Sequence, residues 1–514
     1  MNPISRRDVF HGLTSALCGS GGAIISPLLL SRADAQVTPD VVRFRPEIEP
    51  LVALIERTPR EQCAAMAVDQ LRRGVSYRQL MAALFLAGIR NVNPRPPGFA
   101  MHCVFVIHAA HLLSLEAPPD SRLLPLFYAL DNFKTAQDRD LKAAPGDYSM
   151  RPISGPLPAP ERAAAELTSA MEAWDQERAE RAVVSLARHR SPEEVLGMLW
   201  RYGARDYRNI GHKAIYVANA CRTLHAIGWQ HAEPVLRSLV LGLLDFGREQ
   251  QVNGYAFDDQ CYAANLKRVK ETFAKLGDGW VSTAADSAAT RGILSVLRES
   301  APEEACADVA ARLVKNTANA GAVWDAVHLA AAELRMRTRS NAIVGLHAVT
   351  SANALHHAWL AAADPQLRYL LALQGAGWMA QFRKFAQDRE KDLRSFPITE
   401  MEPADAEPTE RAMQEAFAGI PANLDASGAR VLRLAREAPA RQMFLSTAMR
   451  LTIAKANEVH YYKYLAAMIE DIPLVSPEWQ PHMTAAAAYY IKGSGDPEPA
   501  AMKLAREALK GLAA

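Results

Sequence analysis

The stretch ERAAAELTSAMEAWDQERAERAVVSLARH, residues 161–189, repeats apolar residues three and four positions apart, with charged residues between them. This spacing places the apolar side chains along one face of an α-helix. The C-terminal stretch AAMKLAREALKGLAA, residues 500–514, has the same pattern. Alternating runs rich in β-branched and aromatic residues are scarce, so few strands are expected. The sequence therefore predicts an all-α protein, a large multi-helix bundle.

Three proline-rich stretches interrupt this helical pattern, at residues 91–99, 144–161 and 396–410. Proline clusters of this kind end helices and are typical of loops. We expect one all-α domain over residues 36–514. The stretches at 144–161 and 396–410 are interpreted either as loops or as boundaries between subdomains.

The first 35 residues have the layout of an export signal. An uncharged segment over residues 12–30 follows a positively charged start, and the small residues ADA at 33–35 provide a cleavage site. The segment SRRDVF, residues 5–10, resembles a twin-arginine signal, with its phenylalanine one position late. These features predict the twin-arginine export machinery as a partner, a periplasmic or secreted location, and no stable membrane anchor after cleavage. An ordinary secretory signal or an uncleaved anchor is the alternative.

The charge balance argues against several classes of partner. The 58 Lys and Arg residues nearly equal the 56 Asp and Glu residues. No basic excess is present to neutralise a phosphate backbone, so nucleic-acid binding is not expected. The predicted partner is a small molecule. The five cysteines after the signal contain no C-x-x-C pair, which indicates core residues rather than a thiolate metal site.

Histidines are concentrated in four apolar segments. They are His102, His108 and His111 in residues 100–115, His212 in 208–224, His347, His356 and His357 in 344–359, and His460 in 457–468. Neutral imidazoles are good ligands for Fe, Zn, Cu or Ni, and inward-facing helices can assemble them in a bundle core. The alternative is that each histidine is an ordinary core residue. The distribution predicts a multi-histidine metal site in the core of the bundle.

The segment NEVHYYKYLAAM, residues 457–468, sets His460 and Lys463 one helical turn apart. Its aromatic and apolar neighbours predict burial, yet no nearby carboxylate lies on the face of Lys463. A lysine in apolar surroundings loses its proton readily, because desolvation disfavours the ammonium. The alternative is that Lys463 extends to solvent and His460 bonds a backbone carbonyl.

Three of these segments resemble the questin oxidase-like family, which acts on anthraquinone-type aromatic polyketides. GLHAVTSANAL (345–355) and NEVHYYKYLAAM (457–468) carry most of the resemblance, GHKAIYVANACRTL (211–224) carries less, and AHLLSL (110–115) is similar to the family's first histidine segment. The resemblance implies a helical, mononuclear non-haem iron oxygenase. In that family the iron is held by histidines together with a lysine carboxylated on its side-chain nitrogen.

The resemblance implies a ligand set for this chain. The matching positions are His347, His460, Lys463 and His212, with His111 preferred as the first histidine over His102 and His108. Lys463 would carry a carbamate derived from CO2, and Fe(II) is the expected metal, with Zn or Cu as alternatives. Thr350, Asn353 and His356 are candidates for supporting the metal or lining the pocket.

We therefore expect an oxidoreductase, an iron-dependent oxygenase that uses O2 and a small molecule. An aromatic compound is a candidate substrate, but an exported oxygenase does not fit an intracellular polyketide, so the substrate stays open. The first alternative is a Zn- or Cu-dependent periplasmic hydrolase or metal-binding protein with the same histidines. The second is a non-catalytic helical interaction protein.

Overall fold

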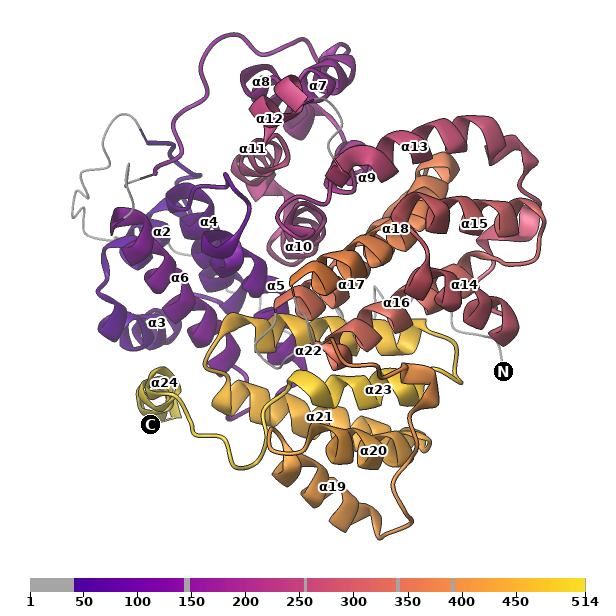
Figure 1. The fold of residues 1–514 in the computed structure, drawn as a ribbon. Helices are drawn as coiled ribbons and strands as arrows, with labels where there is room; N and C mark the ends of the chain where they lie inside the picture. Colours follow the sequence, from indigo (N-terminus) through magenta and orange to yellow (C-terminus); the bar gives the residue numbers. More distant parts are fainter. Residues whose placement is uncertain (1–40, 143–147, 254–256, 339–342, 390–392, 514) are drawn as a thin grey trace, which may run out of the picture. The chain divides into compact units, whose positions relative to one another are not determined.

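The computed structural model describes residues 41–142, 148–253, 257–338, 343–389 and 393–513. Over these residues the chain forms α-helices and short 3-10 turns with no strand, which confirms the prediction of an all-α fold (Figure 1). The chain from Asp40 to Ala514 forms one compact unit. The predicted export signal, residues 1–35, lies outside the described residues.

The N-terminal group comprises five helices, and one of them carries the first predicted histidine segment. They are α2 (Glu49–Arg57), α3 (Cys63–Arg72), α4 (Tyr77–Asn91), α5 (His102–Glu116) and α6 (Leu124–Lys142). Helix α4 begins at a capping box, in which the Ser76 hydroxyl accepts from the Gln79 backbone N–H and the Gln79 side chain accepts from the Ser76 N–H. Helix α5 is apolar around most of its circumference, so it is buried on several sides.

The second group of helices contains the stretch over residues 161–189. These helices are α7 (Ala163–Glu172), α8 (Gln176–His189), α9 (Pro192–Gly203), α10 (His212–Ile227), α11 (Ala232–Leu243), α12 (Gly247–Asn253) and α13 (Phe257–Thr272). The stretch forms two helices rather than one, because Trp174 has a left-handed backbone with φ of 57°. Asp175 then starts α8, its side chain accepting from the Arg178 N–H.

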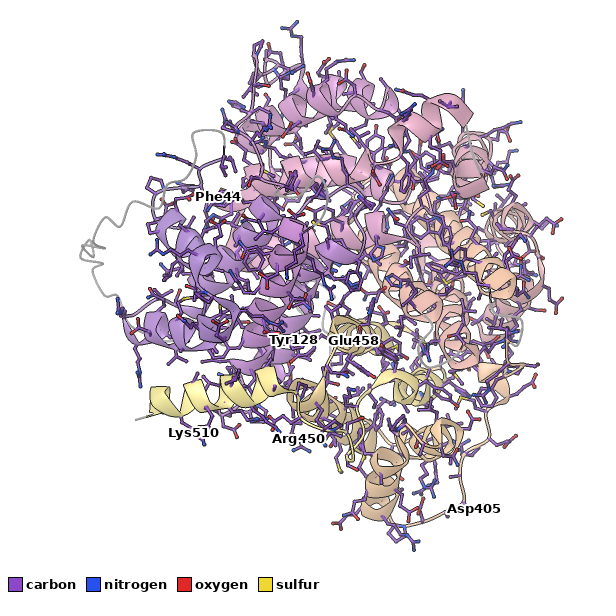
Figure 2. The ribbon with its side chains drawn as sticks, turned by 60° about the vertical axis from the view of Figure 1, so that its left-hand side comes forward. Phe44, Tyr128, Asp405, Arg450, Glu458 and Lys510 are labelled. Carbon is purple, nitrogen blue, oxygen red and sulfur yellow. The ribbon has the colours of Figure 1, made fainter. Side chains whose placement is uncertain are left out.

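The third and fourth groups complete the bundle. They are α14 (Ser287–Glu299), α15 (Pro302–Val314), α16 (Ala320–Arg337), α17 (Ile343–Ala361), α18 (Pro365–Arg389), α19 (Thr409–Gly419), α20 (Leu424–Ala435), α21 (Ala438–Lys455), α22 (Val459–Asp471), α23 (Gln480–Ala487) and α24 (Ala500–Ala513). The last helix, α24, which carries Lys510, packs on α3 and α6 from the start of the chain (Figure 2). The C-terminal helix thereby closes the unit against its N-terminal helices.

Four helices from distant parts of the chain meet at the centre. Helix α5 contacts α10, α10 contacts α17, α17 contacts α22, and α22 contacts α5 (Figure 1). Each predicted histidine segment supplies one of these four helices. The tertiary fold therefore brings together residues as far apart in sequence as His102 and His460, which are 358 positions apart.

The proline-rich stretches run as irregular connections between helices wherever they are described. Residues 92–98 join α4 to a 3-10 turn before α5, and residues 401–408 precede α19. The stretch Phe99–Glu116 is long and apolar enough to cross a membrane by length and composition, but 61% of it is buried inside the bundle. It is therefore weak evidence for a membrane span. All five described cysteines are buried core residues.

Candidate metal centre

Four histidines, one from each central helix, converge in the core. His102 and His212 are the first residues of α5 and α10, His460 is the second residue of α22, and His347 lies in the second turn of α17. None of these four residues is more than 6% exposed. We call these four residues together with Lys463 the histidine centre.

The Nε2 atoms of these rings face one another. His212 Nε2 lies 2.9 Å from His102 Nε2 and 3.0 Å from His347 Nε2. The ligand nitrogens of His102, His347 and His460 all lie within 4.8 Å of one another. Spacings of 2.9 and 3.0 Å fit neighbouring nitrogens placed around a single ion with M–N bonds of about 2.0–2.1 Å.

The outer nitrogens of three rings have oxygen partners that fix the tautomer. His212 Nδ1 lies 2.6 Å from the Asn209 carbonyl, and His347 Nδ1 lies 2.7 Å from the Ile343 carbonyl. A carbonyl only accepts, so each Nδ1 carries the proton and each Nε2 presents a lone pair when the ring is neutral. His212 and His347 therefore direct lone pairs, and not N–H groups, at the middle of the histidine centre.

The rings are held neutral. Burial, followed by the neighbouring Lys463 and histidines, lowers the pKa of His102, His212 and His347 well below the ordinary value. Burial also lowers the pKa of His460, although its carboxylate partner opposes this. Two acceptor nitrogens 3.0 Å apart, on His212 and His347, repel each other unless a cation lies between them. Because the rings do not readily take up protons, the arrangement fits a metal ion.

Glu458 supports His460 from outside the histidine centre. It is the N-cap residue of α22, and one carboxylate oxygen accepts from the His460 backbone N–H at 3.1 Å and from His460 Nδ1 at 2.6 Å. Its other oxygen accepts from the Tyr490 hydroxyl at 2.5 Å. Burial alone raises the pKa of Glu458, but the bonds to His460 and Tyr490 outweigh it and lower that pKa. Glu458, at the start of α22, is labelled in Figure 2.

His460 Nε2 and Lys463 Nζ are buried and have no hydrogen-bond partner among the described residues. Lys463 is 4% exposed, and its Nζ lies 5.6 Å from the centre of the Phe105 ring. Burial lowers the pKa of Lys463 to about 7. A neutral amine is a nucleophile. Polar atoms in a protein core that have no partner are costly unless a ligand binds them.

The backbone before His212 is strained. Asn209 and Ile210 have φ of 56° and 49°, and Gly211 has φ of 81°. A left-handed β-branched residue is a genuine outlier, and such strain is concentrated at functional sites. Gly211 also has no room for a side chain, because a Cβ there would overlap the Ser351 hydroxyl and lie 3.2 Å from the Trp378 ring. This backbone lets His212 start α10 directly against α17.

The structure places His111 away from the histidine centre, contrary to the preference for it as the first histidine. His111 Nδ1 lies 3.2 Å from the Tyr77 hydroxyl, and burial lowers its pKa to about 4. His102 occupies the first position instead. The two residues are nine positions apart on α5, about two and a half turns, so they point to opposite sides of the helix.

The other predicted residues lie beside the histidine centre in a second set of polar side chains. His108 Nε2 bonds Glu470 at 2.8 Å, and Asn353 accepts from Arg222 at 2.9 Å. Asn353 also donates to Glu470 at 3.0 Å and to Asp471 at 2.8 Å. We call this set the carboxylate network; its members are His108, Arg222, His328, Asn353, His356, Glu470 and Asp471.

The far end of the carboxylate network contains another pair of histidines. His328 Nδ1 lies 3.4 Å from Asp471, and His328 Nε2 lies 2.8 Å from His356 Nδ1. The His356 ring stacks on Trp324 with 4.4 Å between ring centres. His356 is nine residues after His347 on α17, so it too points away from the histidine centre.

A small cavity separates Lys463 from the carboxylate network. Its wall includes Lys463, His108, Arg222, Glu470 and Thr350. The centre of a water-sized molecule has about 20 Å³ in which to move. That space holds one or two waters or another molecule of that width. Thr350 is otherwise bonded to the Leu346 carbonyl at 3.1 Å.

Sequence reasoning missed Glu458, Glu470 and the strained turn over 209–211. Glu458 has a visible signal, since an acidic residue two positions before a buried histidine at a helix start is a good N-cap. Among the described residues, the histidine centre offers a nitrogen-rich donor set suited to Fe, Zn, Cu or Ni. No family model matches the chain, and no curated protein or solved structure is significantly similar to it.

Proposed function

We propose that this protein is an oxidoreductase, a mononuclear non-haem iron-dependent oxygenase whose metal is held by the histidine centre. The observation that carries the proposal is the convergence of the His102, His212 and His347 Nε2 atoms, with spacings of 2.9 and 3.0 Å. Lone pairs at that distance, on rings that burial keeps neutral, are stabilised by a cation. Iron as the metal and oxygenation as the reaction rest on the family resemblance of the histidine segments.

The histidine centre can offer a metal both nitrogen ligands, from the imidazoles, and oxygen ligands, from a carbamate on Lys463. Four neutral imidazoles supply no negative charge, and the nearest carboxylate, Glu458, lies behind His460 and not among the converging Nε2 atoms. Lys463 can supply the missing anion, since its neutral amine can add CO2 and become a carbamate with oxygen donors. The unpartnered Lys463 Nζ beside a buried cluster supports this role.

When bound, ferrous iron would supply the capacity to reduce dioxygen, which organic side chains lack. The residues of this chain bind and orient the metal and exclude water. Backbone carbonyls of Asn209 and Ile343 hold two rings in one tautomer, and Glu458 does the same for His460. Phe105 contributes an apolar surface to the cavity beside Lys463.

The small size of the cavity beside Lys463 bears on the substrate. As it stands, the cavity has room for a molecule of the width of water or dioxygen and not for an aromatic ring. We propose that a larger substrate approaches from the other side of the histidine centre, where Phe99 is 64% exposed and its ring centre lies 5.5 Å from that of His102.

Elemental analysis tests the proposal directly. The protein is purified without chelator and without nickel affinity resin, beside a Lys463→Ala variant and a matched Lys492→Ala control. Lys492 is buried at 6% exposure near Tyr461 and lies outside the histidine centre. We expect about one iron per chain in the parent and control, and much less in Lys463→Ala. Iron-loaded protein should then consume oxygen with some members of an aromatic substrate panel.

Other results would support other functions. One zinc or copper per chain would retain the histidine ligands and favour a hydrolase or a metal-binding protein. No metal in any of the three proteins, all folded, would contradict the proposal and favour a helical interaction protein with a histidine-rich core.

A further inference from the structure

The side of the Lys463 cavity that faces the carboxylate network is lined by charged groups that the proposed metal site does not use. His108, Arg222 and Glu470 line the cavity together with Lys463 and Phe105. The cavity is only wide enough for one or two water-sized molecules. A molecule inside it would therefore contact Lys463 and the charged wall at the same time.

His108 and Glu470 form a base with a defined orientation. His108 Nε2 lies 2.8 Å from Glu470 Oε1. Burial alone raises the pKa of Glu470, but Arg222 and His108 outweigh it and hold that pKa far below its usual value. An ionised carboxylate only accepts, so His108 Nε2 carries the proton and Nδ1 has the lone pair. A histidine oriented by a carboxylate in this way is a general base.

Glu470 is itself fixed in place. Its second oxygen, Oε2, accepts from Arg222 at 2.9 Å and from Asn353 at 3.0 Å. These two bonds leave Oε1 for His108 and prevent the carboxylate from turning away. The side chains of His108 and Glu470 are 14% and 22% exposed, whereas Lys463 is sealed in the core. The pair therefore connects the cavity to solvent.

We propose that this cavity is the chamber in which Lys463 is carboxylated: it holds one molecule of dissolved CO2, and His108, oriented by Glu470, accepts the proton that the reaction releases. This inference rests on the proposed function, in which Lys463 becomes a carbamate. It assigns a catalytic residue to the step that completes the metal site, and it assigns CO2 as the ligand of the cavity.

The step balances without an oxidant or a reductant. The lone pair of the neutral Lys463 amine forms an N–C bond to CO2, and one C=O π pair moves onto oxygen. One N–H proton of the adduct leaves for His108 Nδ1, directly or through one water. The products are a carbamate anion and an imidazolium, which faces the Glu470 carboxylate. The proton then leaves through the exposed edge of His108.

The surroundings of Lys463 explain why His108 is needed. Among the described residues Lys463 Nζ has no hydrogen-bond partner that could take its proton. The His212 and His347 imidazoles are already engaged, since their Nδ1 atoms bond the Asn209 and Ile343 carbonyls and their Nε2 atoms face each other at 3.0 Å.

The rate of carboxylation tests this role. The full chain is freed of metal and CO2, 13C-labelled bicarbonate is added, and the carbamate carbon is followed by 13C NMR. The key variant is His108→Gln, whose amide keeps the N–H donor to Glu470 and lacks the basic nitrogen. The control is His225→Gln, an exposed histidine on α10. We expect His108→Gln to slow the reaction by about 100-fold, since general bases contribute factors of this size. The final carbamate level should be unchanged.

The outcomes separate this inference from the proposed function. Equal rates in the parent and in folded His108→Gln would overturn the role of His108 and leave the metal site intact. A parent protein that binds iron but forms no carbamate would overturn carboxylation and retain the histidines. If His108→Gln does not fold, the parent is compared in H2O and D2O. An unchanged rate would then contradict a rate-limiting transfer to His108, and a slower one would support it.

Discussion

The histidine centre and the carboxylate network share the helices α5, α10, α17 and α22, and the network adds His328 from α16. They differ in how their charges are matched. In the carboxylate network, Glu470 has partners on both oxygens, in His108, Arg222 and Asn353. In the histidine centre, the inner atoms are nitrogen lone pairs and an unpartnered amine. Buried polar groups are costly without partners, so Glu470 is satisfied within the network, whereas the centre leaves His460 Nε2 and Lys463 Nζ without partners among the described residues.

The two regions also lie at different positions along the helices. Three residues of the histidine centre lie at helix starts, whereas Arg222, Glu470 and Asp471 lie in the second halves of α10 and α22. The start of a helix carries partial positive charge and disfavours an imidazolium. The helix starts therefore favour neutral metal ligands in the centre. The network, further along the same helices, contains the charged groups.

The largest expected effect is a difference in metal binding between two variants of helix α5. His102→Ala should reduce bound metal from about one per chain to below about a tenth, because a ligand is lost. His111→Ala, on the opposite side of α5, should keep the parent metal content. Elemental analysis of both proteins, purified in parallel, makes the comparison. Equal metal content in the two variants would show that His102 is not a ligand.

A substitution in the carboxylate network should lower the stability of the fold and leave the metal content unchanged. Arg222→Met leaves Glu470, in a mostly buried position, without its cation. We expect the free energy of unfolding to fall by about 3 kcal/mol, with metal content unchanged. The control is Arg394→Met, which breaks the exposed pair with Asp425 and should cost less than ~1 kcal/mol. Urea unfolding measures both. Loss of metal in Arg222→Met would mean that the two regions are not separate.

Lys463 should make the stability of metal-free, CO2-free protein depend on pH. Its pKa is about 7 in the folded chain and 10.5 in an unfolded one, so between these values the unfolded state binds more protons. Stability therefore rises with pH from about 7 to 10.5, by up to ~1.4 kcal/mol per pH unit.

A Lys463→Met variant removes the titrating amine and should abolish that rise. Denaturant unfolding at several pH values, in sealed CO2-free buffer, compares it with the parent protein. A parent profile that matches the Lys463→Met profile would show that Lys463 is not held neutral in the folded chain.

The smallest expected effect is on metal affinity, when the carboxylate that bonds His460 loses its charge. Glu458→Gln keeps an acceptor for His460 Nδ1 but removes the negative charge. Outer partners of metal-bound histidines typically contribute 10–100-fold in affinity, so we expect metal affinity about tenfold lower. Competition with a coloured chelator measures it, and exposed Glu410→Gln on α19 is the control. An unchanged affinity would limit Glu458 to capping α22.

Local pattern was enough to predict the helices but not all of their ends. Apolar spacing indicated helices at 161–189 and 500–514, and the second forms as α24. The first divides at Trp174, whose left-handed backbone has no signature in the pattern. Instead, Trp174 is held by tertiary contacts, including the Arg205 guanidinium 3.7 Å from its ring centre.

The candidate site was predictable to the level of segments. Composition and spacing identified the four histidine segments and the pair His460 and Lys463, because each places ligands in apolar surroundings. The choice among His102, His108 and His111 was not predictable from the residues around them. All three lie on one apolar helix with little amphipathic pattern, so nothing local indicates which side faces the core.

The sequence by itself determined that this chain folds into helices and that four of them carry buried histidines, because helical periodicity and side-chain polarity are local properties. The tertiary structure alone decided which histidines meet, since His102 faces α10 and α22 only after α5 packs between them. It also decided that Glu470 binds His108 and Arg222, residues 362 and 248 positions away. Such contacts depend on the rotation of each helix about its axis, which packing of the whole bundle sets.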